Sequence, residues 1–457
     1  MHKKVVALIL AFSMMVALLA GCGQQAADES STVPAVSEAS SAASQPAETG
    51  EKKQGVINYW SFMNEGEPIQ MWMQTFIDDY MKDNPDVKVN VTWSGREVLT
   101  KLRTRMSAGI SDDFPDVTDQ MNDTILDLQN KDGIFLPLDE YMESKAYGSD
   151  QKFKDIFIPS ILERGRAKDG KLYAIPREVY IQAMFYNTKM FEKYGLEAPK
   201  TWDEFLKVCE TLKANGIAPI AFDGAFEEYV AWYFTRMSER VVGYDELHKA
   251  CKGEILWSSN PAFLDIAKKL QELVDKQYLQ KNYQGTTWPG AQMLWVQGKA
   301  GMFSCGTWLP AELSESTPKD FVMNIFKFPS ITGEKYPNYE QAWGNYWTVL
   351  KDAPHKDLAV DFIKYTLQKK YDDAKSDLMV PSPLKDGKPV KELSTQVTIM
   401  TEAETTGPIY GNLFEYGDYY NIVFNKNAND LMNGNIKADA FIAKMDESTK
   451  NYYKNKG

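Results

Sequence analysis

Carboxylates, amides and aromatic rings recur in this sequence directly after predicted strands. Carboxylates and amides make directed hydrogen bonds, and an aromatic ring presents an apolar face. Because ligands of α/β proteins bind outside the carboxyl ends of strands, these residues predict a binding site. For each acid, a helix N-cap or a solvated loop stays an alternative. The candidates after strands are Asn64, Glu65, Asp119, Gln120, Asp123 and Asp223, with Tyr229 and Trp232 downstream of Asp223. Further candidates are Glu178 and Tyr180 after the Pro176 segment, Trp343, Asn345 and Trp347 at the start of a later segment, and Tyr419 and Tyr420.

Motifs typical of enzymes, metal sites and nucleotide sites are not found in the sequence. It has no P-loop, no G-x-G-x-x-G, no Cys-x-x-Cys and no EF-hand loop. The run Gly301–Gly306 contains Ser304 but lacks the G-x-S-x-G spacing of a nucleophile elbow. The three histidines, His2, His248 and His355, are far apart. We therefore expect no catalytic residue, no metal and no cofactor.

The composition indicates a globular protein that does not bind nucleic acid. The 457 residues are 44% hydrophobic, a usual share for a folded chain, and suggest about three domains or two large ones. Lys and Arg number 51 against 63 Asp and Glu, which gives a net charge of −12. Without a basic excess, the chain cannot neutralise many phosphates.

The first residues predict export and membrane attachment. His2–Lys4 is followed by the apolar stretch Val5–Leu19, which at about 15 residues is shorter than the roughly 20 that span a bilayer. The stretch ends in Leu19-Ala20-Gly21-Cys22, which resembles the bacterial lipobox. We expect residues 1–21 to be a signal peptide and Cys22 to carry lipid, including palmitate. A buried cysteine after an apolar helix is the alternative. The lipid would hold a secreted protein on the outer face of the bacterial cytoplasmic membrane.

Residues 22–54 are predicted to form a disordered tether behind the lipidated cysteine. The segment after Cys22 has no aromatic residue and is rich in Ala, Ser, Gln and Glu. Such a segment buries too little apolar surface to offset the entropy of ordering. As a flexible coil, its ends would lie about 30 Å apart.

Strands and helices alternate at the start of the remaining chain. Residues 56–60 and 87–93 have the pattern of strands, and a third strand is entered at 114–117. Helical spacing of apolar residues lies between them, at 69–80 and 99–106. This βαβαβ order predicts a sheet with parallel pairs and helices on its faces.

A second strand–helix region follows after residue 200. Thr201 and Glu204 form a capping box for a helix that buries Cys209 and stops at Asn215-Gly216. A strand is expected at 217–222, and further helices at 261–276, 355–370 and 436–450. Cys209, Cys251 and Cys305 are an odd number, which excludes a disulfide framework but leaves one bridge open. A buried free thiol is the preferred interpretation for Cys209.

Several segments in this order closely resemble the extracellular solute-binding proteins of carbohydrate ABC importers, the family that includes maltose-binding proteins. They are YAIP at 173–176, FYNTKMFEKYGLEAPKTWDEF at 185–205, VQGKAGMFSCGTW at 296–308 and AWGNYWTVLKDAPHKDLAVDFIKY at 342–365. The resemblance covers nearly all of residues 55–457. Thr188 and Gly301 depart from the family pattern, and 371–420 matches it poorly.

The resemblance implies an α/β fold of the two-lobed, type II periplasmic-binding-protein kind, with a ligand cleft between lobes joined by several hinge crossings. The first lobe would use residues 55–177 and 342–375, and the second 181–338 and 376–457. The chain would cross near 178–180, 339–341 and 376. Ligand binding would favour closure of the lobes.

The resemblance also implies that Trp308 lies against a sugar face. Tyr419 and Tyr420 are further stacking candidates, in the region that matches the family poorly. The partners would be a mono- or oligosaccharide and the permease subunits of an importer, with the ATPase on another chain. We expect a monomer that is not an enzyme. Two alternatives remain: a binding protein for a polyamine, amino acid or oxyanion, and a secreted glycoside hydrolase. The many tryptophans disfavour oxyanions, which prefer backbone N–H groups and arginines.

Overall fold

The computed structural model describes residues 53–109 and 114–455. The predicted signal peptide, Cys22 and the tether up to residue 52 lie outside these residues. Lys53, at the end of the predicted tether, belongs to the folded unit, because its amine contacts Asp361 Oδ2 at 2.6 Å. Within the described ranges, no helix is both long and apolar enough to cross a bilayer.

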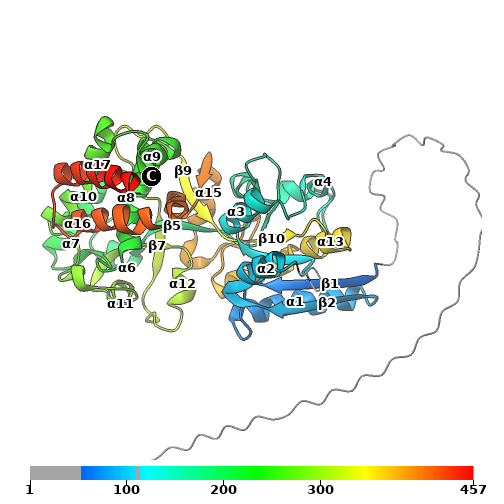
Figure 1. Ribbon diagram of the computed structural model, residues 1–457. Helices are drawn as coiled ribbons and strands as arrows, with labels where there is room; N and C mark the ends of the chain where they lie inside the picture. Colours follow the sequence, from blue (N-terminus) through cyan, green and yellow to red (C-terminus); the bar gives the residue numbers. More distant parts are fainter. Residues whose placement is uncertain (1–52, 110–113, 456–457) are drawn as a thin grey trace, which may run out of the picture. The chain divides into compact units, whose positions relative to one another are not determined.

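The first sheet has the strand order β2-β1-β3-β10-β4. Strands β1, β2 and β10 are labelled in Figure 1. Strand β1 is parallel to β2 and β3, as the βαβαβ pattern predicts, and β10 is antiparallel to β3 and β4. The strands are β1 (Gly55–Ser61), β2 (Val87–Trp93), β3 (Val117–Met121), β4 (Ile175–Pro176) and β10 (Asn345–Val349). The helices that follow these strands in sequence are α1 (Pro68–Asp83), α2 (Val98–Ser107), α3 (Asn122–Asp132), α4 (Asp139–Met142), α5 (Pro159–Leu162), α13 (Lys356–Thr366) and α14 (Lys369–Ala374).

The second sheet has the order β11-β9-β5-β7-β6, with β8 also paired to β5. Strands β6 and β7 are parallel, whereas β5 is antiparallel to β7, β8 and β9. The strands are β5 (Tyr180–Asn187), β6 (Ala218–Ala221), β7 (Ala300–Gly306), β8 (Met323–Phe326), β9 (Tyr339–Trp343) and β11 (Thr405–Gly407). The accompanying helices are α6 (Thr188–Lys193), α7 (Trp202–Ala214), α8 (Glu227–Val241), α9 (Tyr244–Cys251), α10 (Pro261–Asp275), α11 (Gly290–Val296), α12 (Leu309–Glu312), α15 (Gln396–Glu402), α16 (Lys426–Met432) and α17 (Ala438–Lys454).

Local signals in the sequence are confirmed around α7. Thr201 Oγ1 accepts from the Glu204 amide, and the Glu204 carboxylate accepts from the Thr201 amide, so the capping box is complete. The helix ends before Asn215 and buries Cys209. Cys209, Cys251 and Cys305 are all buried free thiols.

Three clusters of buried side chains form the core. One lies around the first sheet and includes Tyr59 and Trp347. Another lies around the helices of the second sheet and includes Trp232. The third contains residues of both regions, such as Leu99 from α2 and Phe185 from β5. The apolar interior is therefore continuous between the two sheets.

The chain passes between the sheets at three places. It goes from β4 to β5 through residues 177–179, from β9 to β10 at Gly344, and from α14 to β11 through 375–404. The predicted second crossing, near 339–341, is too early, because β9 pairs with β5 as far as Trp343. At Gly344, a Cβ would lie 2.0 Å from the Glu178 carbonyl oxygen, so only glycine fits this contact. The exact lobe boundaries stay a prediction.

A buried ion network joins the first two crossings. The Arg177 Nη1 donates to Asp119 Oδ2 at 2.6 Å, and its Nε donates to Glu178 Oε2 at 2.5 Å. Tyr59 donates to Asp119 Oδ1 at 2.5 Å, and Asn345 Nδ2 donates to Glu178 Oε1 at 2.6 Å. Arg177 is 1% exposed and both carboxylates are 0% exposed, so these charges are stable only through each other.

The third crossing is tied to the same network. The Lys375 amine donates to the Arg177 carbonyl oxygen and pairs with Asp372 Oδ1 at 2.7 Å. Asp372 Oδ2 in turn accepts from Ser382 Oγ at 2.6 Å. All three crossings therefore contribute to one group of buried charged side chains.

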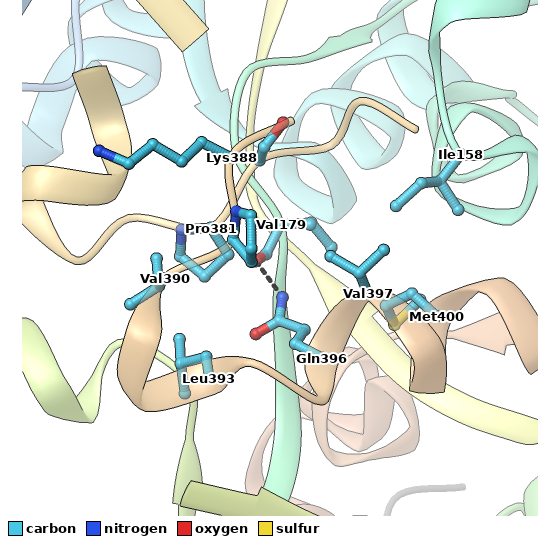
Figure 2. A pocket seen from close by; sticks show the side chains of 11 residues that line it. Ile158, Val179, Pro381, Lys388, Val390, Leu393, Gln396, Val397 and Met400 are labelled. Carbon is cyan, nitrogen blue, oxygen red and sulfur yellow. Dashed lines mark hydrogen bonds between the residues drawn. The ribbon is translucent and has the colours of Figure 1, made fainter. Parts of the chain in front are cut away.

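A small apolar pocket lies beside these crossings (Figure 2). Val179, Pro381 and Ile158, the residue before α5, line it. Gln396 of α15 donates to the Val179 carbonyl at 3.0 Å. Its volume of about 10 Å³ has room for about one water molecule. The pocket is thus a packing defect at the crossing and has no room for a solute.

A second buried chain of hydrogen bonds fixes Trp232 on α8. The Trp232 indole N–H donates to Gln341 Oε1 at 2.5 Å, and Gln341 Nε2 donates to Glu239 Oε2 at 2.5 Å. Tyr339 donates to Glu239 Oε1 at 2.7 Å. Trp232 and Glu239 are seven residues apart and share a face of α8, which packs against alternate residues of β9. The plane of the Trp232 ring is therefore set by β9.

We expect Arg177→Met to lower the free energy of unfolding by about 3–5 kcal/mol, because Asp119 and Glu178 would stay buried without a cation. Urea denaturation measures this loss. Lys437→Met is the control, since the Lys437–Asp275 pair is 63% and 45% exposed and its removal should change stability by less than about 1 kcal/mol. A loss in Arg177→Met no larger than in the control would contradict this account of the crossings.

We expect stability to fall as pH rises from about 5 to 8 through Glu239. Burial raises the pKa of Glu239 from 4.5 to about 7, against the lowering effect of Tyr339, Gln341 and Arg236. The folded state thus keeps a proton that the unfolded state releases near pH 4.5. This stabilisation is complete below pH 4.5 and is lost through pH 7, with a slope of at most about 1.4 kcal/mol per pH unit.

The measurement is urea denaturation of the wild type and Glu239→Gln at several pH values. The variant should have a shallower slope, whereas the exposed acid in Glu447→Gln should leave the slope unchanged. Equal slopes in the wild type and Glu239→Gln would show that Glu239 does not titrate in this range.

Candidate ligand-binding site

Aromatic rings from distant parts of the second region meet in one cluster. Trp232 stacks on Trp308 with ring centroids 6.1 Å apart and an interplanar angle of 12°. Trp343 lies 5.5 Å from Trp308 and 5.9 Å from Trp232. The aromatic cluster, as we call it, consists of Tyr180, Tyr229, Trp232, Trp308, Trp343 and Tyr410. The sequence predicted all of these except Tyr410.

Trp308 is the tryptophan of the aromatic cluster that reaches solvent: it is partly exposed, as are Tyr180 and Tyr229, whereas Trp232 and Trp343 are 1% and 4% exposed. Strand β7 delivers it to the carboxyl edge of the sheet, and the chain then turns into α12. A Cβ on Gly306 would lie 1.7 Å from the Trp308 ring, so glycine lets the ring fold back over the strand end. Trp308 thus offers a ring held on several sides.

A groove lies between α3 and the segment 405–415. Met121 and Asp123 line one side, and Tyr339, Ile409 and Asn412 line the other. Its volume of about 1240 Å³ exceeds the roughly 300–1,000 Å³ of typical small-ligand pockets. Ile409 is next to Tyr410 of the aromatic cluster in sequence. Tyr339 of the groove and Trp343 of the cluster are the two ends of the same strand, β9. The groove and the aromatic cluster are therefore adjacent.

Charged and amide side chains provide the hydrogen-bonding capacity of the groove. Asp123 forms an ion pair with Arg164 at the start of α3, with side chains 20% and 15% exposed. On the facing side, Asn412 Nδ2 donates to Glu415 Oε2 at 3.3 Å. His248 approaches Glu415 Oε1 at 3.1 Å, and this hydrogen bond lowers the pKa of the Glu415 carboxyl. The groove thus combines donors and acceptors with an aromatic end.

The facing wall of the groove includes a strained turn. Tyr410, Gly411 and Asn412 have φ values of 52°, 61° and 57°, in the left-handed region. For Tyr410 and Asn412 this conformation costs about 1 kcal/mol or more each. His248 Nε2–H donates to the Gly411 carbonyl at 2.7 Å and holds the turn against α9. Tertiary contacts therefore impose this shape.

Several predicted site residues are buried and serve the structure. Asp119, Glu178 and Asn345 belong to the ion network, and Trp347 is fully buried beside Tyr59, with centroids 5.2 Å apart. Four further candidates are buried and have partners inside the protein. Gln120 accepts a hydrogen bond from the Met121 amide, and Asp223 accepts one from the Ala291 amide in α11. The Tyr419 hydroxyl is hydrogen-bonded to the Thr449 hydroxyl, and Tyr420 stacks on Phe424. We no longer propose Trp347, Tyr419 or Tyr420 as direct ligand contacts.

The first strand ends in a loop at the surface. Asn64 and Glu65 are exposed, and Asn64 Nδ2 donates to Glu67 Oε1 at 2.7 Å. Neither residue lines the groove. Their role as ligand contacts stays a prediction.

Sequence reasoning missed Arg164, Tyr410, Asn412 and Arg177. Arg177 had a usable signal, since a charged pair inside the apolar run IPREVYI requires a buried partner. Arg164 and the left-handed turn have no such local signal. Among the described residues, no group of three or more His, Cys, Asp or Glu side chains is arranged to hold a metal ion.

Comparisons with known proteins agree with this architecture. Among curated relatives, the multiple sugar-binding protein of Streptococcus mutans is 25% identical over 389 residues, which cover 82% of this chain and 86% of that protein. The melibiose/raffinose/stachyose-binding protein MelE of Bacillus subtilis is 25% identical over 299 residues, 63% of this chain and 64% of MelE. Among solved structures, RafE of Streptococcus pneumoniae in its apo form has a TM-score of 0.68 at 20% identity, covering 87% of this chain and 98% of RafE.

The structural likeness establishes the fold as the two-lobed, type II arrangement of periplasmic binding proteins. The sequence profile of bacterial extracellular solute-binding proteins matches residues 65–373, which is more than half of the chain. This chain therefore belongs to the family of bacterial extracellular solute-binding proteins.

Proposed function

We propose that this protein is the substrate-binding component of a carbohydrate ABC importer and binds a mono- or oligosaccharide at the aromatic cluster and the groove. The observation that carries the proposal is the partly exposed ring of Trp308, fixed by Trp232, Trp343 and Tyr180. A pyranose has C–H patches on its faces and hydroxyls at its edge. The Trp308 ring can cover the C–H patches, and the polar side chains of the groove can hydrogen-bond to the hydroxyls.

The names of the relatives support a sugar over other solutes. Multiple sugars, melibiose, raffinose, stachyose and diacetylchitobiose appear in the names of proteins that match this chain. The groove is lined by the cations Lys131, Arg164 and Lys168. Arg164 is paired with Asp123 and Lys131 with Asp127, which disfavours an oxyanion ligand. A glycoside hydrolase is disfavoured because the matching relatives are named as binding proteins. We therefore propose a non-enzymatic role.

Delivery completes the proposed function. The closed, loaded protein would present its sugar to membrane permease subunits whose ATPase is a separate chain. Closure would be driven only by the difference in affinity between the closed and open states. We propose a monomer, secreted and held on the outer face of the cytoplasmic membrane through Cys22.

Thermal-shift and calorimetric titration of the full-length chain test the ligand class. The panel contains three series of one to four sugar residues: galactose, melibiose, raffinose and stachyose; xylose to xylotetraose; and N-acetylglucosamine to chitotetraose. Spermidine, amino acids and phosphate are the competing solutes. A ligand that binds the folded state raises its melting temperature. A shift with spermidine or an amino acid and with none of the sugars would replace the carbohydrate proposal.

We expect Trp308→Ala to weaken sugar binding by about 1–3 kcal/mol, about 5- to 150-fold, through loss of the stacking surface. Because Trp308 also packs against two core clusters, the variant should lose about 1–3 kcal/mol of stability, below the roughly 3–5 kcal/mol of a fully buried tryptophan. Calorimetry and urea denaturation measure the two effects.

Trp257→Phe is the matched control for Trp308→Ala. Trp257 is fully buried between α10 and α17, away from the aromatic cluster. Its replacement should lower stability and leave the affinity of the folded protein unchanged. If Trp308→Ala behaved in the same way, Trp308 would be a core residue only.

We expect Cys22→Ser to move the protein from the membrane fraction to the soluble exported fraction, because the thiol is the nucleophile of lipid transfer. Labelling with a radioactive fatty acid and fractionation measure this change. Cys209→Ser, at a buried thiol, should keep the label. Retention of label and membrane attachment in Cys22→Ser would disprove lipidation at this residue.

A further inference from the structure

Trp288 is an exposed aromatic ring in a chain whose other large rings are mostly buried. It is 47% exposed, whereas Trp257 and Trp295 are completely buried. A side chain this exposed contributes little to the core, and one exposed ring is not unusual on a protein surface. What sets Trp288 apart is that its ring is fixed on a polar partner.

The Trp288 ring is held in place by hydrogen bonds. Its indole N–H donates to Glu312 Oε1 at 2.9 Å, and Gln292 Nε2 donates to the same oxygen at 2.9 Å. Glu312 is the last residue of α12, and Trp308 directly precedes this helix. The Glu312 amide also donates to the Trp308 carbonyl at 3.2 Å. One short helix therefore connects Trp288 to Trp308.

Trp288 also lies at the edge of the sheet where the aromatic cluster is found. Strands β6 and β7 are parallel, so their carboxyl ends lie at the same edge, with Asp223 after β6 and Trp308 after β7. The segment that contains Trp288 is bonded to Asp223, because Asp223 Oδ1 accepts from the Ala291 amide at 2.9 Å. Ligands of such sheets bind outside this edge.

We propose that Trp288 is a second stacking platform for an oligosaccharide that extends beyond Trp308, with the Glu312 carboxylate accepting hydrogen bonds from its hydroxyls. The Trp288 indole and the Gln292 amide both donate to Glu312 Oε1. The other carboxylate oxygen of this exposed side chain, Oε2, is the one that would accept from a ligand. A ring fixed before binding loses little side-chain entropy when a sugar stacks on it. This proposal rests on the proposed function and makes it specific for oligosaccharides.

A single ring beside a carboxylate has the composition of a sugar subsite. A docking surface for a permease would need a larger apolar area. The occupant we propose is therefore a neutral sugar chain, and docking of a protein partner is an outcome of the test.

The test compares affinities along the three sugar series in the full-length chain. We expect Trp288→Ala to weaken binding of the longest sugar that the wild type binds by about 3- to 10-fold and to leave the shortest unchanged. Trp288→Phe retains an aromatic face and should recover most of the loss. Trp308→Ala should weaken binding at every length.

Tyr336→Ala is the control, because Tyr336 is 48% exposed and precedes β9 at the opposite edge of the second sheet. It should bind all lengths as the wild type does. Equal affinities of Trp288→Ala and the wild type, or an equal loss at every length, would overturn the proposal. If sugar binding were unchanged but stimulation of the importer's ATPase fell, Trp288 would instead contact the permease. Absence of any sugar binding by the wild type would overturn the proposed function itself.

Discussion

Arg177 is buried between two carboxylates where the chain first passes from one sheet to the other, and the surrounding segments are arranged to satisfy this charge. A guanidinium removed from water is stable only when its donors find acceptors. Asp119 comes from β3 and Glu178 from the crossing itself, Asn345 of the second crossing donates to Glu178, and Lys375 of the third donates to the Arg177 carbonyl oxygen. One desolvated charge thus aligns segments that are far apart in sequence.

This arrangement bears on how the two sheets can move. Gly344 lies against the Glu178 carbonyl with no room for a side chain, and the apolar pocket beside Val179 is almost filled. Closely packed segments of this kind have little free volume, so they resist deformation. If the lobes close over a solute as proposed, we expect the rotation to occur in the backbone on either side of the ion network, which would act as a pivot.

The rings of the aromatic cluster are also held in position before a ligand binds. The chain of hydrogen bonds from Trp232 through Gln341 to Glu239 orients one ring, and Gly306 allows Trp308 to lie over it. Rings held by their neighbours have little conformational freedom left to lose, so more of the stacking energy remains as affinity. The polar groove beside the cluster supplies directed bonds. Together they suit a ligand with both apolar faces and hydroxyl edges.

Local patterns in the sequence were sufficient for the first βαβαβ elements with their parallel strands and for the Thr201 capping box, whereas Trp308 was singled out by the family resemblance. Periodicity, capping and turn chemistry act over a few residues, so they are readable without partners. The positions of Trp343 and Trp347 were not readable in this way. They are four residues apart, yet Trp343 ends β9 in the second sheet and Trp347 lies in the core of the first. Likewise, Asp119 and Glu178 resemble ligand-binding acids until Arg177 is seen between them, and the left-handed turn at Tyr410–Asn412 depends on His248, more than 150 residues away. Strand pairing and the partner of a buried charge are set by long-range contacts, and only the tertiary structure brings those residues together.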